Sequence, residues 1–402
     1  MITSLAAWSN ERSILLVPPP LTKEVDVTQT PSFVSLEYFV NQVIFTLSLF
    51  ATHSQLLYNQ LLSKNLLFSS MNQNWKKFLL SQNATFESDT CISFPAKADD
   101  TDNTIYPVAH LAVLTVSGKD AAKLLQGQIT CDVNDVSETK SSLGALCNPK
   151  GRAITTFLLV KTGDVFLMVL PKELLEAVKK RLQMYVLRSD VTLTDSSDQL
   201  CLLGLCHLDN QSGFLFATTQ EEIIAVNLSE TESRYLVIAE VDKAIALWSD
   251  RIGNQGFQPE NSEQWRYLDI ISGIPWLTTE TSEEFIPQML NLDLLGGISF
   301  NKGCYTGQEI VARTHYLGKA KRALFLAECD TPYAPEPNST IIDDSTGTEQ
   351  AIGKVLLAQS FHSAHGNEGT RCKMLIVLQV SDNDTGNLQL KDNNHNKITL
   401  LT

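Results

Sequence analysis

The pattern of apolar and polar residues changes near residue 70. Residues 1–70 contain only seven charged side chains and include an apolar stretch over residues 43–50. Polar residues at 41–42 and 53–55 bound that stretch, which leaves it well short of the roughly 20 residues that a spanning helix needs. We therefore expect residues 1–70 to be an extension outside the fold, and we expect no membrane span.

From Met71 onward the pattern predicts ordinary helices and strands. Runs of β-branched and apolar residues between turn residues predict strands, and apolar residues three or four positions apart predict helices. The predicted strands cover 111–116, 153–160, 165–169, 200–205 and 235–238, and the predicted helices begin near 74 and 120 and cover 174–186 and 263–271. The mixture indicates an α+β domain over residues 71–317.

The pattern changes again at Gly318. Strands are predicted at 323–327, 352–357, 374–380 and 398–401, with Pro- and Gly-containing loops between them and no long helix. We expect residues 318–402 to form a small C-terminal β-barrel or sandwich.

Composition narrows the classes of partner. The net charge of −14 opposes broad attraction to nucleic acids or anionic membranes, so no direct nucleic-acid contact is expected. The eight cysteines form no CxxC pair and no secretory signal precedes them, which favours a reducing, cytoplasmic location.

The segment around Cys304 is the strongest candidate for chemistry. Four glycines within residues 296–307 predict a tightly shaped loop. Lys302, Arg313 and a helix beginning around Gly307 could stabilise a thiolate at Cys304. An isolated cysteine is more often a small buried hydrophobic residue, however, and the local sequence leaves both interpretations open.

A family resemblance changes this balance. The run Lys302-Gly303-Cys304-Tyr305-Thr306-Gly307-Gln308-Glu309 is similar to the signature of the YgfZ family, which is related to the aminomethyltransferase T-protein of glycine cleavage. Further similarity covers 125–133, 147–152, 285–288, 291–292, 296–300, 312–313 and 321–324.

The resemblance implies a fold and a set of site residues. The fold is an α+β aminomethyltransferase-like folate-binding domain with ferredoxin-like subdomains, followed by a small C-terminal β-barrel. Cys304 would be the functional thiol, and Trp265 would contact a folate pterin, because an indole face suits a flat heterocycle. Leu111 stands where many bacterial members have a second tryptophan, so it is a weak folate contact. The supporting motif residues are Lys302, Gly303, Tyr305, Gly307, Gln308, Glu309 and Arg313.

The carboxylates of the transferases are missing. Their catalytic aspartate corresponds to Thr155 or Thr156, and a hydroxyl is a poor proton acceptor at neutral pH. Their pterin-anchoring glutamate corresponds to Ile271, and the nearby Asp269 is a weaker candidate for the same role. These replacements favour a binding protein over an enzyme.

The resemblance therefore predicts a cytoplasmic accessory factor that binds tetrahydrofolate and supports assembly or repair of iron–sulfur clusters. Its partners would be cluster carriers and iron–sulfur enzymes, including enzymes that thiolate tRNA, and Cys304 could transiently ligate a cluster. The alternatives are a tetrahydrofolate-dependent aminomethyl transferase and a protein-interaction module in which the cysteine only packs.

Other candidate sites carry less weight. Cys201 and Cys206 lie in one predicted strand at an odd spacing, so their thiols should point to opposite faces rather than share a metal. His362 and His365 lie in a predicted loop without partner ligands at a useful spacing. Phosphate-binding glycine motifs and a GxSxG elbow are absent from the sequence.

Overall fold

Residues 69–402 form one compact unit. The computed structural model describes residues 71–95, 103–207, 213–318, 320–331, 333–344, 350–361, 371–380, 387–392 and 396–401. The predictions for residues 1–70 and for His362 and His365 lie outside the described residues. No helix within the described ranges is both long enough and apolar enough to cross a membrane.

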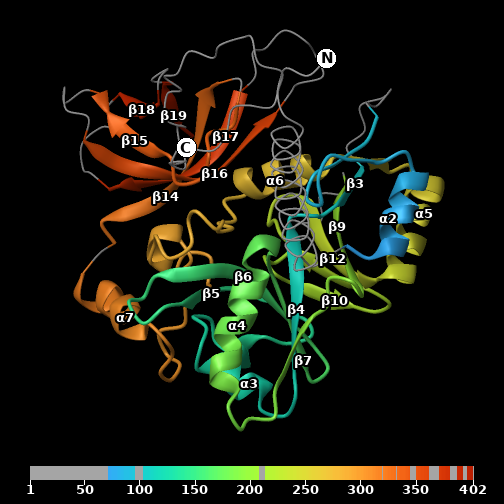
Figure 1. Cartoon of the computed structure of the whole chain (residues 1–402), viewed down its shortest axis with the longest axis horizontal. Coiled ribbons are helices and arrows are strands. Elements are labelled where there is room, and N and C mark those ends of the chain that lie inside the picture. Colours follow the sequence, from blue (N-terminus) through green and yellow to red (C-terminus); the bar gives the residue numbers. More distant parts are fainter. Residues whose placement is uncertain are drawn as a thin grey trace, which may run out of the picture. The chain divides into compact units, whose positions relative to one another are not determined.

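A five-stranded antiparallel sheet forms the first layer, in the order β5-β6-β7-β4-β8. Its strands are β4 (Leu111–Ser117), β5 (Ser142–Cys147), β6 (Ala153–Thr162), β7 (Val165–Pro171) and β8 (Thr192–Asp195). Helices α3 (Ala121–Gln126) and α4 (Leu175–Val186) lie against one face (Figure 1). The apolar spacing in α4 predicted this helix, and it buries Leu175, Val178, Leu182 and Val186.

A six-stranded sheet forms the second layer, in the order β10-β11-β12-β9-β3-β13. It contains β3 (Thr104–Pro107), β9 (Leu200–His207), β10 (Thr218–Gln220), β11 (Ile224–Asn227), β12 (Ser233–Glu240) and β13 (Gln258–Pro259). Helices α2 (Gln73–Ser81) and α5 (Val241–Gln255) pack together beside it. The pattern did not predict α5, because β12 runs directly into this helix without a glycine or proline.

The second sheet separates two apolar cores. Cys201 belongs to the core beneath α2 and α5, whereas Cys206 packs against the core shared with the first sheet. The prediction that these two thiols lie on opposite faces of β9 is confirmed. A hairpin lies at the edge of this region, and its strands, β1 (Thr85–Phe86) and β2 (Ile92–Ser93), are each two residues long.

The C-terminal part is a six-stranded barrel-like sheet in the order β18-β15-β16-β17-β14-β19. Its strands are β14 (Arg322–Asp330), β15 (Thr340–Asp343), β16 (Ala351–Phe361), β17 (Arg371–Gln379), β18 (Leu388–Leu390) and β19 (Ile398–Leu400). A bridge between Gln389 and Lys397 joins the two edges, so the predicted β structure is present and nearly closed.

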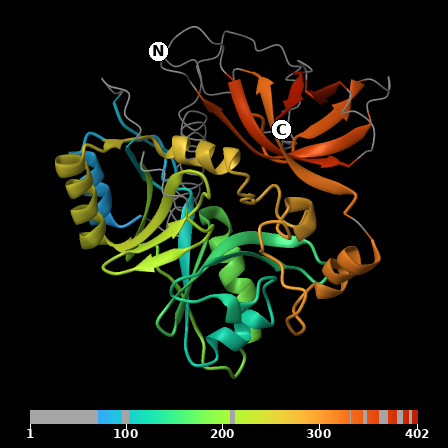
Figure 2. The same ribbon diagram turned by 180° about the vertical axis from the view of Figure 1, so that it is seen from behind.

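Two further helices connect these parts. Helix α6 (Ser262–Ile271) packs on β16 and β17, and α7 (Gln308–Leu317) precedes β14. Figure 2 shows α7, in orange, at the periphery, just before the chain enters the barrel. Short 3-10 helices cover Val133–Asp135, Lys172–Leu174 and Pro287–Leu290.

Candidate functional site

Lys302 anchors the cysteine loop, defined here as residues 301–307. Its side chain is 8% exposed, and Nζ donates hydrogen bonds to the carbonyl oxygens of Ile129 (2.9 Å) and Cys131 (2.8 Å). Nζ also lies 5.2 Å from the centre of the Tyr305 ring. Burial lowers the pKa of Lys302 to about 8, although Cys131 and Asp132 oppose the shift. Lys302 therefore ties the loop to the segment that follows α3.

The next residues of the loop strengthen the same connection. Thr306 Oγ1 donates to Gln128 Oε1 at 3.0 Å, and the Thr306 amide donates to the Gly127 carbonyl at 3.2 Å. Tyr305 is buried, which raises the pKa of its phenol above the usual value. These contacts join the 302–309 motif to the 126–132 segment that the resemblance also singled out.

Gly307 and Gly151 fit together at the start of α7. Gly307 has φ +85°, and a Cβ there would lie 2.5 Å from the Asn148 carbonyl oxygen. Gly151 has φ +69°, and its Cβ would lie 2.7 Å from Cβ of Ile310. Only glycine adopts both the left-handed backbone and this close approach without strain. The 147–152 segment is thus the third part of the loop's support.

Cys304 differs from every other cysteine of the chain in its exposure. It is exposed, whereas Cys91 and Cys206 are partly buried and the other five are buried. All eight lie in described residues, and none of them forms a disulfide. A Cβ added at the neighbouring Gly303 would have no atom within 4 Å, so the side of the loop at Gly303 is open. The structure therefore places Cys304 at the surface and not in the core.

Residues upstream of the loop connect α7 and the barrel. Gln288 Nε2 donates to the Val311 carbonyl at 2.6 Å. Asn291 Nδ2 donates to the Leu324 carbonyl at 2.9 Å, and its Oδ1 accepts from the Leu324 amide at 3.3 Å. These contacts give a structural reason for the family-like residues at 285–288 and 291–292. Gln288 holds α7, the helix that follows Cys304, and Asn291 holds the first barrel strand.

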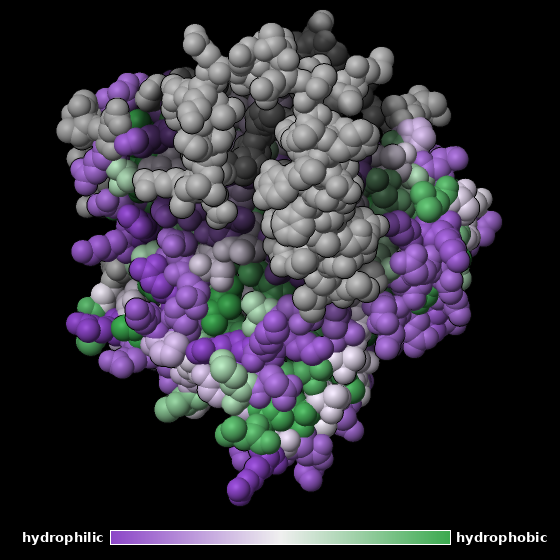
Figure 3. All heavy atoms as spheres, in the orientation of Figure 1, coloured by the Kyte–Doolittle hydropathy of each residue, from purple (hydrophilic) through white to green (hydrophobic). Residues whose placement is uncertain are grey.

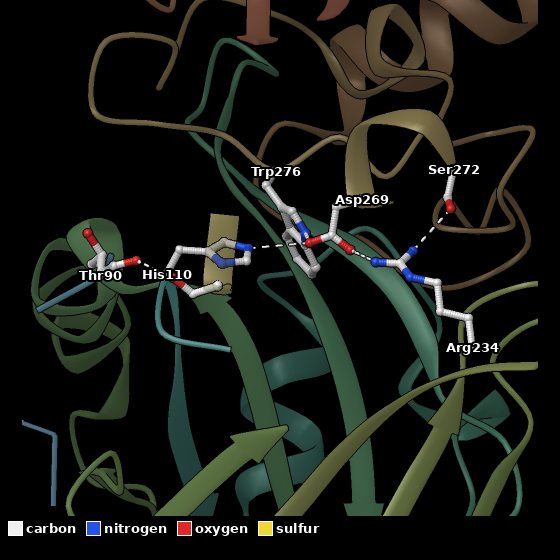
Figure 4. A network of polar contacts seen from close by, with 7 residues as sticks. Thr90, His110, Arg234, Asp269, Ser272 and Trp276 are labelled. Atoms are coloured by element: carbon white, nitrogen blue, oxygen red, sulfur yellow. Dashed lines mark hydrogen bonds and ion pairs between the residues drawn. The ribbon is translucent and has the colours of Figure 1, made fainter. Parts of the chain in front are cut away.

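A buried charged network lies around Asp269 on α6 (Figure 4). Arg234 of β12 pairs with Asp269 and donates to Ser272 Oγ at 3.0 Å. The indole Nε1 of Trp276 donates to Asp269 Oδ2 at 2.9 Å, and His110 Nε2 lies 3.3 Å from the same oxygen. Sequence reasoning considered Asp269 but missed its partners, which come from distant parts of the chain.

The network compensates the buried carboxylate fully. Burial alone would raise the pKa of Asp269, but the charge of Arg234 and the hydrogen bonds from His110 and Arg234 outweigh it and lower the pKa. Burial lowers the pKa of His110, with the bond to Asp269 opposing the shift. Asp269 is therefore an ionised, saturated structural group rather than an available base.

Trp265 is completely enclosed beside this network. The Arg234 guanidinium lies 4.2 Å from its ring centre, and the Tyr106 ring centre lies 5.4 Å away. Its ring also lies against Gly204, where a Cβ would come within 2.1 Å of a ring carbon. Its Nε1 has no hydrogen-bond partner among the described residues. A pterin could stack on this indole only if Arg234 moved aside.

Comparisons with known proteins give a consistent result. Residues 87–206 match the family model for the GCVT N-terminal domain. The tRNA-modifying protein YgfZ of Colwellia psychrerythraea is 34% identical over 250 residues, which cover 59% of this chain and 75% of the relative. The protein of the same description from Klebsiella pneumoniae is 34% identical over 292 residues, covering 70% of this chain and 86% of that relative.

The chain belongs to the YgfZ family. A solved structure supports the YgfZ-type fold: glycine cleavage system aminomethyltransferase T from Bartonella henselae aligns with a TM-score of 0.65 at 12% identity. The alignment covers 83% of this chain and 97% of that one. The predicted aminomethyltransferase-like fold, followed by a small barrel, is confirmed.

At the positions that the resemblance assigns to the transferase carboxylates, this YgfZ chain has Thr155, Thr156 and Ile271. Thr155 and Thr156 are buried in β6, and their hydroxyls donate to the carbonyls of Thr156 (2.9 Å) and Pro275 (2.7 Å). Ile271 is 39% exposed at the end of α6. Proton transfer at these positions has no side chain to carry it.

The remaining predicted residues lie in two places. Leu111 is buried at the start of β4 and lines a cavity of about 40 Å³ together with Trp75 and Lys172. Gln308 Nε2 donates to the Gly303 carbonyl at 3.4 Å, and Glu309 and Arg313 are exposed on α7. The structure thus gathers the YgfZ motif, and Trp265 is not part of the cavity that Leu111 lines. Among the described residues, no group of three or more metal-binding side chains comes together.

Proposed function

We propose that this chain is a folate-binding accessory factor that supports the assembly or repair of iron–sulfur clusters in client enzymes, including enzymes that thiolate tRNA. The observation that carries the proposal is the exposure of Cys304, unlike every other cysteine in the chain, on a loop fixed by three separate segments. Its family membership and the names of its relatives support the tRNA-related part of this role.

The proposed work of Cys304 is ligation. After losing its proton, the thiolate would donate an electron pair to an iron of a cluster that a carrier protein delivers, and a client would then take the cluster as cargo. The supporting contacts of Lys302, Thr306 and Gly307 hold the loop without covering the thiol. We place this exchange in the cytoplasm, where free thiols persist.

The folate part of the proposal rests on the fold and on Trp265. The indole Nε1 is buried and unpaired among the described residues, so a polar ligand atom could supply the missing acceptor. Leu111 could contribute only apolar contact. Binding without one-carbon transfer is favoured, because Thr155 and Thr156 are engaged with carbonyls and Asp269 is held by Arg234.

The thiol is tested by complementation. In cells lacking the protein, Cys304→Ser should fail to restore the activity of iron–sulfur enzymes and the level of thiolated tRNA. Cys91→Ser, at a partly buried cysteine, is the matched control and should restore both. If both Cys304→Ser and Cys304→Ala restore them, the thiol has no such role and the chain is an interaction module.

Folate binding is tested by titrating tetrahydrofolate into the whole protein while following tryptophan fluorescence. Saturable quenching is expected in the parent and a smaller change in Trp265→Phe, which separates Trp265 from the other four tryptophans. Absence of saturable binding would remove folate from the proposal.

The alternative function, an aminomethyl transferase, makes an opposite prediction. Transfer of a labelled carbon from a methylamine donor to tetrahydrofolate, abolished by Asp269→Asn, would establish it. We expect no transfer, because Asp269 is buried and its oxygens are already paired.

A further inference from the structure

Three aromatic rings gather at the C-terminal end of α7. The rings of Phe300 and His315 are stacked, with centroids 3.7 Å apart and an interplanar angle of 13°. Tyr316 meets both edge-on, at 6.1 Å from Phe300 and 4.7 Å from His315. Phe300 is partly buried, whereas His315 and Tyr316 are exposed. Because one face of His315 rests on Phe300, its exposure leaves the outer face open for another flat ring.

The charge of this segment is opposite to that of the chain. Residues 294–327 contain five basic side chains, of which Lys302 is buried, and one acidic side chain, Glu309, in a protein of net charge −14; Asp293 and Glu328 flank the segment. Arg313 and Lys321 are exposed, and Arg313 lies one helical turn before Tyr316 and Leu317. Glu309 lies in the first turn of α7, at the opposite end from the rings. An open aromatic face beside positive charge fits a ligand with both flat bases and phosphates.

We propose that the platform formed by Phe300, His315 and Tyr316, together with Arg313 one turn earlier on α7, binds single-stranded RNA. A base would continue the Phe300–His315 stack, and a phosphate would contact Arg313. The expectation of no direct nucleic-acid contact came from the net charge of the whole chain, which does not describe this local surface.

Other exposed apolar surface on the molecule lacks this combination. Figure 3 shows apolar atoms gathered over α3 and α4, where Met184 and Leu187 are exposed. That surface has no stacked aromatic rings among the described residues. We therefore place the RNA contact at α7.

The test is fluorescence anisotropy with the full-length protein and a labelled single-stranded RNA of mixed sequence, about 12 nucleotides long. The parent should bind saturably at low salt, and His315→Ala and Tyr316→Ala should each weaken binding on the order of tenfold. Arg313→Gln should reduce the slope of log affinity against log salt by about 0.7, as expected when one phosphate contact is lost. Phe214→Ala is the matched control, because this aromatic side chain is 87% exposed elsewhere, and it should bind like the parent.

Two results would overturn the proposal: no binding by the parent, or unchanged binding by both His315→Ala and Tyr316→Ala. If RNA does not bind but Tyr316→Ala abolishes support of iron–sulfur enzymes in cells, the platform contacts a protein instead. The binding assay contains neither folate nor cluster, so its outcome is independent of the proposed function.

Discussion

Lys302 and Arg234 are both buried cations, but the chain compensates them in different ways. Lys302 donates to two neutral carbonyl oxygens, those of Ile129 and Cys131. Arg234 faces the carboxylate of Asp269, which His110 and Trp276 also hold. Carbonyl dipoles satisfy the hydrogen bonds of an ammonium without cancelling its charge, so burial lowers the pKa of Lys302 to about 8.

The difference separates a paired charge from a titratable anchor. The Arg234 and Asp269 pair is neutral as a unit and links β12 to α6 in the interior. Lys302 lies below an exposed loop and can lose its proton in mildly alkaline solution. The cysteine loop should therefore respond to pH in a range where the network does not.

Removing Arg234 should have the largest effect. Arg234→Met leaves Asp269 buried without its counter-charge, which should lower the free energy of unfolding by about 3–5 kcal/mol. Urea unfolding followed by circular dichroism measures this loss. The double variant Arg234→Met/Asp269→Leu removes both charges and should be more stable than the single variant. Equal stability of Arg234→Met and the parent would show that the pair is not a buried unit.

Gly307→Ala should have the next largest effect, now on the loop. The left-handed backbone and the approach to the Asn148 carbonyl should together cost about 2–3 kcal/mol of unfolding free energy. Gly303→Ala is the matched control in the same loop, because its Cβ would enter open space, and it should change stability by less than about 0.5 kcal/mol. Thermal unfolding of both variants decides whether the glycines differ as described.

Lys302→Met should be less damaging than loss of Arg234, because it leaves two carbonyls unpaired rather than a charge. We expect a loss of about 2 kcal/mol in unfolding free energy at neutral pH. Chemical denaturation measures it beside Arg234→Met. A loss greater than that of Arg234→Met would reverse the contrast between the two buried cations.

The smallest expected effect per pH unit is the pH dependence of Lys302. Its folded pKa of about 8 lies below the ordinary value of 10.5, so between these values the unfolded chain binds more protons than the folded one. The parent should therefore gain unfolding free energy relative to Lys302→Met as pH rises from 8 toward 10.5, by at most about 1.4 kcal/mol per pH unit. Parallel stability curves for the two proteins over this range would contradict the assignment.

The sequence predicted much of the regular structure and the tight backbone of the cysteine loop. The apolar spacing of α4 and four of the six barrel strands are found as expected, whereas β15 and β18 were not predicted. Helix α5 was missed because no turn residue separates it from β12, and periodicity alone did not mark the change. The boundaries 71–317 and 318–402 stay predictions.

The partners of the site residues could not be predicted from local patterns. The sequence predicted that the positive charge of Lys302 stabilises a thiolate at Cys304. In the structure its ammonium donates to carbonyls 171 and 173 residues earlier in the chain. Arg234 lies 35 residues before Asp269, with several elements between them. Such pairings depend on which strands become neighbours, and a single sequence does not contain that information.

The long separations in the cysteine loop also concern the time at which it forms. Segments near residues 128, 150 and 305 must all be present before Lys302 and Gly307 find their places. Contacts so distant in sequence are slow to form, and the C-terminal partner leaves the ribosome last. A nascent or truncated chain that ends before Lys302 lacks both Cys304 and the ammonium that joins the loop to Ile129 and Cys131. The exposed thiol therefore becomes available only after the cysteine loop has been synthesised and has packed against the earlier segments near residues 128 and 150.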